Sequence, residues 1–183
     1  MQAWAKSPDS LKLYAYAFVQ FRRLACIAAL DAAIEASARF ADAYTLRAAC
    51  QVYVGSFSML SWHRFGSDAD EGLEMAKRVG RGSPHATFIE GLRLWFGPVL
   101  VGDQRGACEA FFWATKAFGD DDGPGPESSS MRDSVGIRWG AAEANFWMGR
   151  CSREDGDHES EYQYYQRALR FAPEFAMVRR IVR

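Results

Sequence analysis

Three histidines are the residues in this chain best suited to acid–base chemistry. His63 lies beside Trp62, and Asp68 follows five positions later. A histidine can act as a general base, and a nearby carboxylate can orient its ring for that role. However, the chain has no G-x-S-x-G turn, no phosphate-binding glycine loop and no H-E-x-x-H motif. We therefore expect no catalytic site and interpret His63, His85 and His158 as ordinary solvent-exposed histidines, with an enzyme centred on His63 as the less favoured alternative.

Neither the cysteines nor the acidic residues have the spacing of a metal site. Cys26, Cys50, Cys108 and Cys151 form no C-x-x-C pair, and each lies in an apolar stretch with helical periodicity. Free cysteine in such a stretch behaves as a small buried hydrophobe, so we expect unpaired core cysteines and a reducing compartment. The run Asp120–Asp122 lacks the alternating carboxylates of a calcium loop. We expect no metal ion and no cofactor.

Arg150 and Arg153 are the clearest candidates for binding chemistry. They lie three residues apart, which places them on one face of a helix. Two guanidinium groups on one face can hold one carboxylate or phosphate together. The neighbouring Glu154 can satisfy one of them instead. The pair therefore favours recognition of an acidic group, with pairing inside the protein as the alternative.

The composition of the chain limits the kinds of partner. Its 183 residues carry 22 basic and 23 acidic side chains, a formal net charge of −1, so no overall field attracts nucleic acid. Apolar residues make up 49% of the chain, enough for the core of one domain. No segment approaches the ~18 apolar residues of a membrane span, and the first residues lack the pattern of a signal peptide. We expect a cytoplasmic protein without a membrane span, and a removed leader is the alternative that stays open.

Helices are the elements that the sequence provides to position these residues. Long stretches are rich in Ala, Leu and Arg, and no run of alternating β-branched residues is long enough to build a sheet. Glycine and proline interrupt the apolar pattern at recurring places, for example at 80–84, 97–98 and 119–125. Recurring breaks indicate repeated units. We therefore predict an all-α repeat fold.

The clearest repeat signature begins at Ala142 and ends at Pro173. Within it, Gly149 is followed by Tyr165 and Ala168 before the terminal proline. This pattern resembles the tetratricopeptide repeat, W-x2-L-G-x2-Y followed by A-x3-F, an alanine and a proline. The resemblance implies that Gly149 lets the two helices of a hairpin approach closely, and that Tyr165 wedges between neighbouring hairpins. The proline ends the second helix, because it lacks the N–H needed to continue it.

Looser copies of the second-helix spacing, A-x3-F-x2-A, precede that unit. The triads that carry it are Ala107–Phe111–Ala114, Ala69–Leu73–Ala76 and, more weakly, Cys26–Leu30–Ala33. The small residues of the matching first helices are Gly91 and Ala48. About nine extra residues around Trp62, and about four within 97–101, lengthen two of the units. In the last unit, Asn145 and Glu161 depart from the pattern, where it has an aromatic residue and an alanine.

The resemblance implies a right-handed superhelical stack of about four tetratricopeptide-like hairpins in one domain, 1–183. The expected hairpins span about 7–40, 41–80, 84–119 and 142–173, with a loop at 120–140 and a capping helix at 174–183. A single hairpin cannot bury both of its faces, so neighbours must stack to complete the core.

In tetratricopeptide proteins the first helices of successive hairpins line a concave groove in which partners bind. Carried over to matching positions, the predicted partner-binding residues are Tyr53, Phe88, Leu92, Trp95, Phe146, Arg150 and Arg153. Aromatic side chains beside arginine are typical of recognition surfaces. The sequence leaves open whether Phe88, Trp95 and Phe146 belong to the groove or to the core.

The function that the resemblance implies is a non-catalytic protein–protein interaction module, a scaffold or adaptor. An aromatic and apolar groove suits a protein or peptide partner such as an amphipathic helix, and self-association is a further alternative. The second hypothesis is a solute-binding or transporter-associated protein, in which the 97–101 turn and the insertion around Trp62 enclose an apolar pocket. The third is the enzyme that uses His63.

Overall fold

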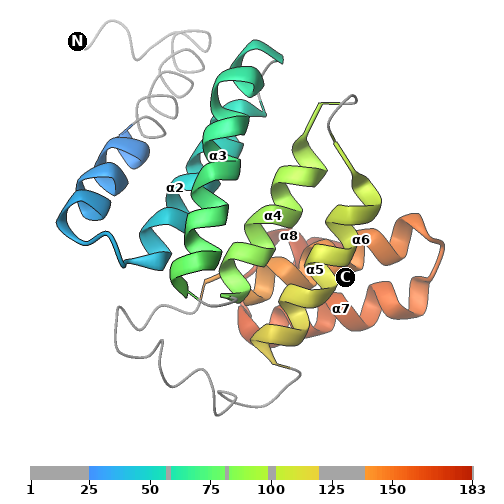
Figure 1. Ribbon diagram of the computed structural model, residues 1–183. Helices are drawn as coiled ribbons and strands as arrows, with labels where there is room; N and C mark the ends of the chain where they lie inside the picture. The colour runs from blue at the N-terminus through green and yellow to red at the C-terminus, as the bar shows by residue number, and fades with distance from the viewer. Residues whose placement is uncertain (1–24, 57–58, 81–82, 99–101, 120–138, 183) are drawn as a thin grey trace, which may run out of the picture. The chain divides into compact units, whose positions relative to one another are not determined.

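The structure is a computed structural model that describes residues 25–56, 59–80, 83–98, 102–119 and 139–182 (Figure 1). Within these ranges every regular element is an α-helix and none is a strand, so the predicted all-α class is confirmed. The chain divides into two compact units, one ending at Gly80 and one beginning at Arg81. Most of the predicted loop at 120–140 and much of the first predicted hairpin lie outside the described residues.

The first unit contains a hairpin made by α2 (Ala41–Gly55) and α3 (Met59–Gly80), preceded by helical residues at 25–36. The two helices pack along each other (Figure 1). α3 has 22 residues, because the predicted insertion around Trp62 continues the helix and forms no separate loop. Trp62 is only 8% exposed, and a Cβ added at Gly55 would lie 3.1 Å from its indole ring. The insertion is therefore packed into its own hairpin.

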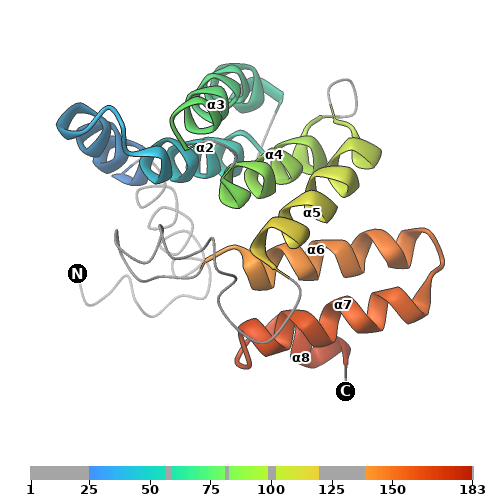
Figure 2. The ribbon, with the colours of Figure 1, turned by 60° about the horizontal axis from the view of Figure 1, so that its bottom comes forward.

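The second unit contains two hairpins and a short last helix. Its helices are α4 (Pro84–Phe96), α5 (Gln104–Phe118), α6 (Ala141–Glu154), α7 (His158–Phe171) and α8 (Ala176–Ile181). α4 packs on α5 and α6 on α7, and α5 also packs on α6, so the two hairpins meet through these middle helices. Figure 2 shows α6 and α7 lying side by side.

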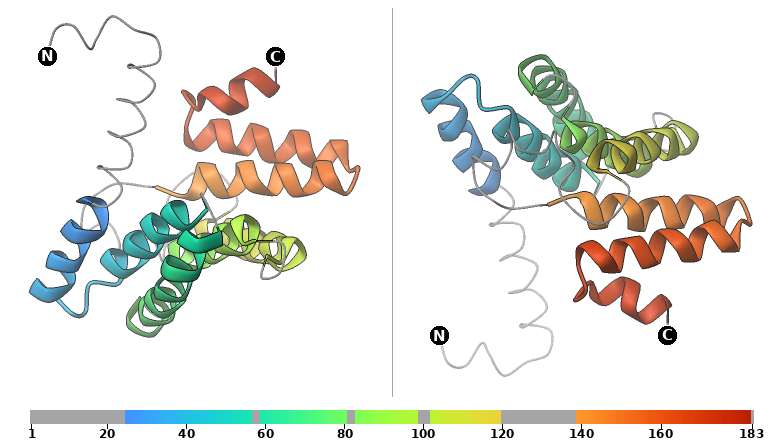
Figure 3. Two further views of the ribbon diagram at one scale, coloured as in Figure 1. Left: turned by 90° about the horizontal axis from the view of Figure 1, so that it is seen from above. Right: turned by 90° about the horizontal axis from the view of Figure 1, so that it is seen from below.

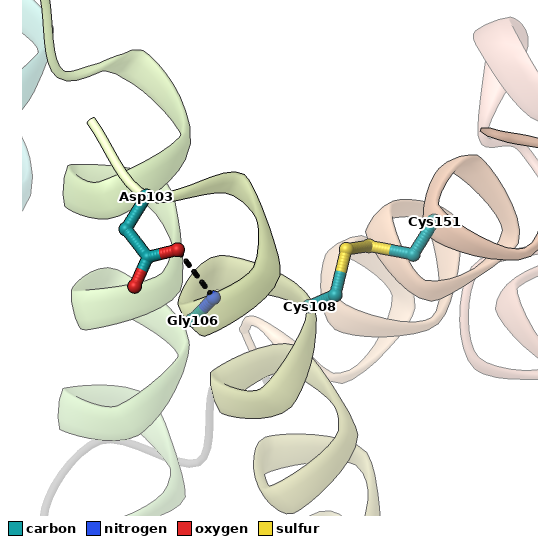
Figure 4. The surroundings of a disulfide bond; sticks show 4 residues. All are labelled: Asp103, Gly106, Cys108 and Cys151. Carbon is teal, nitrogen blue, oxygen red and sulfur yellow. Dashed lines mark hydrogen bonds between the residues drawn. A yellow bond between two sulfur atoms is a disulfide. The ribbon is translucent and has the colours of Figure 1, made fainter. Parts of the chain in front are cut away.

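Local sequence signals set the ends of these helices. Pro84 occupies the first turn of α4, where a missing N–H breaks no helical hydrogen bond. In both hairpins of the second unit, the second helix begins after a capping aspartate. The Gly106 backbone N–H donates to the Asp103 carboxylate at 2.9 Å, and the Ser160 N–H donates to Asp157 at 3.0 Å. The first of these caps is drawn in Figure 4.

A glycine in the first helix faces an aromatic ring in the second helix of both hairpins. A Cβ added at Gly91 would lie 2.5 Å from the Phe111 ring, and one at Gly149 would lie 2.4 Å from the Tyr165 ring. Cβ atoms do not approach ring carbons so closely, so each ring uses space that only glycine leaves free. Tyr165 therefore fills a gap inside its own hairpin, whereas we expected it between neighbouring hairpins.

The last helix, α8, covers one end of the α6–α7 hairpin. A buried cluster there joins Phe146, Tyr165, Ala168 and Val178. The Phe175 ring, just before α8, lies 5.6 Å from the Phe146 ring between centroids. Both views of Figure 3 show α8 folded back beside α7. The 174–183 segment thus shields an apolar face that the hairpin alone would expose to water.

All four cysteines are paired, so the prediction of free core cysteines is wrong. Cys26 is bonded to Cys50 and Cys108 to Cys151, with Cα–Cα distances of 6.5 and 5.9 Å. The partners are separated by 24 and 43 residues in sequence and lie on facing helices. Such long separations form no short motif, so the sequence contains no sign of the pairing. The pairing also removes the support that free cysteines gave to the predicted cytoplasmic location.

Candidate functional site

An aromatic cluster lies where the two hairpins of the second unit meet. It comprises Trp95 and Phe96 at the end of α4, Phe111 in α5 and Trp147 in α6. The Trp147 ring is stacked on Phe111, with 5.7 Å between centroids and 18° between planes. It also lies 5.1 Å from the Trp95 ring and 5.3 Å from the Phe96 ring. Trp147 is therefore the centre of the cluster, at separations where aromatic rings attract.

The aromatic cluster has a buried base and an exposed rim. Phe111 is fully buried, Trp95 and Trp147 are partly exposed, and Phe96 is 43% exposed. Tryptophan and phenylalanine side chains held by packing offer apolar contact area at little cost in conformational entropy. The rim can therefore bind an apolar or aromatic side chain.

Two of the predicted groove residues are core side chains. Phe88 is 3% exposed and its ring lies 6.0 Å from Phe111. Phe146 is 5% exposed and its ring lies 6.0 Å from Tyr165. Both side chains support the helices from inside the hairpins. Trp95 is the predicted aromatic residue that reaches the rim of the cluster.

The remaining apolar predictions differ in their surroundings. Leu92 is partly exposed on α4, one turn before Phe96. Tyr53 is 53% exposed on α2 in the first unit and is not part of the aromatic cluster. Of the apolar positions proposed from the resemblance, the structure thus places Leu92 and Trp95 on the helix that carries the cluster rim.

The two predicted arginines have different roles. Arg150 lies three residues after Trp147, which places both on one side of α6, and it makes no ion pair within the described residues. Arg153 instead pairs with Glu161 of α7 at 3.8 Å. Glu161 also contacts the His158 Nδ1 atom at 3.0 Å. Arg150 is therefore the arginine of the two without an ion pair among the described residues, and its charge also acts on the Tyr165 hydroxyl.

The pKa of the Tyr165 hydroxyl is affected by burial, by Glu161 and by the two arginines. Burial raises the pKa of its hydroxyl, the negative charge of Glu161 raises that pKa further, and Arg150 and Arg153 act in the opposite direction. Among the described residues no group meets the full geometry of a hydrogen bond to the buried hydroxyl oxygen, and Arg153 is close enough to favour its ionised form. Tyr165 therefore stays neutral near neutral pH and acts as a packing residue of the α6–α7 hairpin.

Sequence reasoning missed Trp147 and Phe96, because it took the groove positions from the repeat pattern alone. Trp147 directly follows Phe146, and adjacent helical residues point about 100° apart. Phe146 thus enters the core of its own hairpin, while Trp147 contacts α4 and α5. The one available signal was the four-residue spacing of Trp147 and Cys151, which places the tryptophan on the side of α6 that carries the cysteine.

The histidines have no common environment. His63 is exposed on α3, and Asp68, five residues later, lies on a different side of that helix. His85 is only 7% exposed, so the expectation of three exposed histidines is wrong for it. Its ring lies 5.1 Å from Phe118 and 4.5 Å from Trp139, because α4 begins where these two rings close the end of the hairpin.

The described residues offer neither a metal-binding group nor a membrane-spanning helix. They contain no group of three or more His, Cys, Asp or Glu side chains that could hold a metal ion. No helix among them is both long enough and apolar enough to cross a bilayer.

The comparisons with known proteins found no match. No family model fits the chain, and no curated protein or solved structure matches it. The resemblance to tetratricopeptide repeats therefore rests on the residues of this chain, chiefly the glycine–aromatic pairs Gly91–Phe111 and Gly149–Tyr165.

Proposed function

We propose that the chain is a non-catalytic interaction module of the tetratricopeptide kind, a scaffold or adaptor whose second unit binds an apolar segment of a partner protein. The observation that carries this proposal is the aromatic cluster. Three helices from two hairpins bring rings together that stay partly open to solvent, and Phe96 at the rim is 43% exposed. Rings needed only for the core would be buried, as Phe111 is.

The repeated glycine–aromatic pairs support the tetratricopeptide part of the proposal. Gly91 and Phe111 are separated by four more residues than Gly149 and Tyr165. That difference equals the lengthening expected within the 97–101 turn. Once it is allowed for, the two hairpins place the same contact at the same repeat position, as a stack of similar hairpins requires.

Arg150 gives the partner a second required feature. It lies on the side of α6 that carries Trp147 and has no carboxylate partner within the described residues. An acidic group on the partner would satisfy it with a charge-assisted hydrogen bond. The proposed partner segment therefore combines a large apolar side chain with an aspartate, a glutamate or a terminal carboxylate.

A random peptide library displayed on phage tests this function, with the full-length chain as bait. We expect the recovered peptides to combine an aromatic or large aliphatic residue with an acidic residue. Trp147→Ala removes the central ring, and Arg150→Glu reverses the charge beside it. Each should weaken binding of a recovered peptide by at least ~10-fold, because central aromatic and arginine residues carry most of the energy of an interface.

Trp113→Ala is the matched control. Trp113 is 64% exposed on α5 and lies outside the aromatic cluster, so its removal should leave peptide binding unchanged. Circular dichroism checks that all three variants keep the helical content of the parent chain. Recovered peptides that bind Trp147→Ala and Arg150→Glu as tightly as the parent chain would contradict the proposed site.

A further inference from the structure

The two disulfides join equivalent parts of successive hairpins. Cys26–Cys50 links the helical segment 25–36 to α2, and Cys108–Cys151 links α5 to α6. Both bonds therefore connect the second helix of one predicted hairpin to the first helix of the next. The first-helix cysteine follows the small residue of its hairpin by two positions in each case, in Ala48–Cys50 and in Gly149–Cys151. Because the offset between the small residue and the cysteine is the same in both hairpins, we interpret the two disulfides as a repeated feature of the hairpins.

Cys108–Cys151 lies one helical turn from the centre of the aromatic cluster. Cys108 precedes Phe111 by three residues on α5, and Cys151 follows Trp147 by four on α6. On each helix the cysteine and the aromatic residue therefore share one face. The bond spans the gap between α5 and α6 (Figure 4), and the Phe111–Trp147 stack spans the same gap. The disulfide and the ring stack therefore join the same two helices.

The polypeptide connection between α5 and α6 is long by comparison. It runs from Gly119 to Gly140, between the end of one helix and the start of the other. A long connection constrains the distance between its ends weakly, whereas a disulfide fixes two Cα atoms within a few ångströms. The Cα atoms of Cys108 and Cys151 are 5.9 Å apart. The bond is therefore the short covalent connection between the two hairpins.

We propose that the Cys108–Cys151 disulfide is a redox element that regulates partner binding at the aromatic cluster, so that the binding surface is complete only in the oxidised chain. This regulation rests on the function proposed above. On oxidation the two thiols lose two protons and two electrons and form the S–S bond. The electrons pass to a disulfide oxidant such as glutathione disulfide, which becomes two glutathione thiols. A dithiol reductant reverses the reaction and leaves α6 held to α5 by side-chain packing alone.

If the disulfide regulates partner binding, binding depends on whether the compartment is oxidising or reducing. Cytosolic glutathione and thioredoxin keep thiols reduced, whereas extracellular and other oxidising compartments allow disulfides to persist. The binding-competent chain is therefore the form expected in an oxidising compartment. Cys151 is 3% exposed and Cys108 is partly exposed, so a reductant reaches the bond through the Cys108 sulfur.

The test uses the full-length chain and two matched double variants. Cys108→Ala/Cys151→Ala removes the bond beside the aromatic cluster, and Cys26→Ala/Cys50→Ala removes the equivalent bond of the first unit. Hydrogen exchange measured by mass spectrometry follows the peptides of α6, and near-ultraviolet circular dichroism follows the packed tryptophans. We expect α6 amides to exchange at least ~10-fold faster in the first variant and unchanged in the second. Reduction of the parent chain with a phosphine should reproduce the first variant, and glutathione disulfide should restore the parent signal.

Peptides recovered by phage display then report on binding. We expect them to bind the oxidised chain and the Cys26→Ala/Cys50→Ala variant equally, and the reduced chain at least ~10-fold more weakly. Peptide mapping without reductant should find Cys108 linked to Cys151. Free thiols at these positions after oxidation, unchanged α6 exchange on reduction, or equal peptide binding to both redox forms would each overturn the proposal. Failure to recover any peptide with the oxidised chain would count against the proposed function instead, because the exchange measurement needs no partner.

Discussion

The hairpins α6–α7 and α2–α3 bring their helices together with different residues. In α6–α7, Gly149 of the first helix faces the Tyr165 ring of the second, and an added Cβ would lie 2.4 Å from that ring. In α2–α3 the glycine that faces the small residue Ala48 is Gly72, on the second helix, while Gly55 of the first helix faces the Trp62 ring, 3.1 Å from an added Cβ. A Cβ added at Gly72 would lie 3.5 Å from the Cβ of Ala48, an ordinary contact distance. The position beside Gly149 is thus filled by one ring, whereas the position of Gly72 opposite Ala48 leaves room for a methyl group.

The difference shows which part of the repeat pattern is a physical requirement. Both hairpins need a small residue in the first helix and a buried apolar residue in the second, which is Tyr165 in one and Leu73 in the other. Only the aromatic version uses up all the space beside its glycine. We therefore expect the two hairpins to respond to the same kind of substitution with different signs.

The largest expected effect comes from removing the ring. Tyr165 is 1% exposed, so Tyr165→Ala leaves a cavity between α6 and α7. It should lower the free energy of unfolding by about 4 kcal/mol, the usual cost of truncating a buried aromatic residue. Urea unfolding followed by circular dichroism measures this loss. Tyr162→Ala, at a position of the same helix that is 56% exposed, is the control and should cost less than about 0.5 kcal/mol. Equal losses in the two variants would show that Tyr165 is not a central packing residue.

Filling the space beside the ring should have a smaller effect. Gly149→Ala places a methyl group against Tyr165, and Gly91→Ala does the same against Phe111. Overpacking costs typically 1–3 kcal/mol, and the better helix propensity of alanine offsets up to about 1 kcal/mol of that cost. We expect a net loss of about 1–2 kcal/mol in the free energy of unfolding of each variant, measured by the same urea titration. A gain in stability at either position would mean that the ring can move aside without cost.

Gly72→Ala should have the opposite sign. The new methyl group would make ordinary contacts with Ala48, and alanine is the stronger helix former. We expect an increase of up to about 1 kcal/mol in the free energy of unfolding. Differential scanning calorimetry of the Gly72→Ala and Gly149→Ala chains, side by side, measures the contrast directly. A loss of stability in the Gly72 variant would show that the two hairpins are packed equally tightly.

The parts of the fold that the sequence predicts are those set by nearby residues. Helix ends follow from Pro84, Asp103 and Asp157, whose effects act within one turn. The glycine–aromatic positions follow from the repeat spacing. An insertion is harder to interpret: the residues around Trp62 contain no breaker strong enough to end a helix, so they lengthen α3.

The candidate site is less predictable, because it depends on contacts between hairpins. Trp147 meets Phe111 and Cys151 meets Cys108 across the connection from α5 to α6, whose length carries no information about register. Burial of His85 depends in the same way on Phe118 and Trp139, which come from the two ends of that connection. Spacing within a helix therefore predicted Arg150 as a surface candidate, and the repeat resemblance named Trp95 without deciding between groove and core. The ring that joins the hairpins, Trp147, is evident only from the three-dimensional contacts.

The smallest expected effect concerns the start of the second helix. α7 begins after Asp157 and has Glu159 and Glu161 in its first turn, whereas α3 has no acidic residue in its first turn. Hydrogen bonds from the side chain and backbone N–H of Ser160 lower the pKa of the Asp157 carboxyl below its ordinary value of 3.8. A carboxyl whose folded pKa is lowered stabilises the fold above its unfolded pKa, and that contribution is lost as the pH falls through the folded pKa. Asp157 should therefore make no pH-dependent contribution between pH 5 and 8, and should lose its stabilising effect only below about pH 3.8.

A carbon-detected NMR titration of the Asp157 carboxyl group measures this directly, with an expected midpoint below 3.8. Asp157→Asn is the control, because asparagine caps a helix about as well as aspartate but does not titrate. Its α7 amides should keep the same hydrogen-exchange protection from pH 5 down to pH 3, while those of the parent chain lose protection at the lowest pH. A titration midpoint at or above 3.8 would mean that the Ser160 hydrogen bonds do not favour the ionised carboxylate. The charge-dependent advantage of α7 over α3 would then rest on Glu159 and Glu161 in its first turn and not on the Asp157 cap.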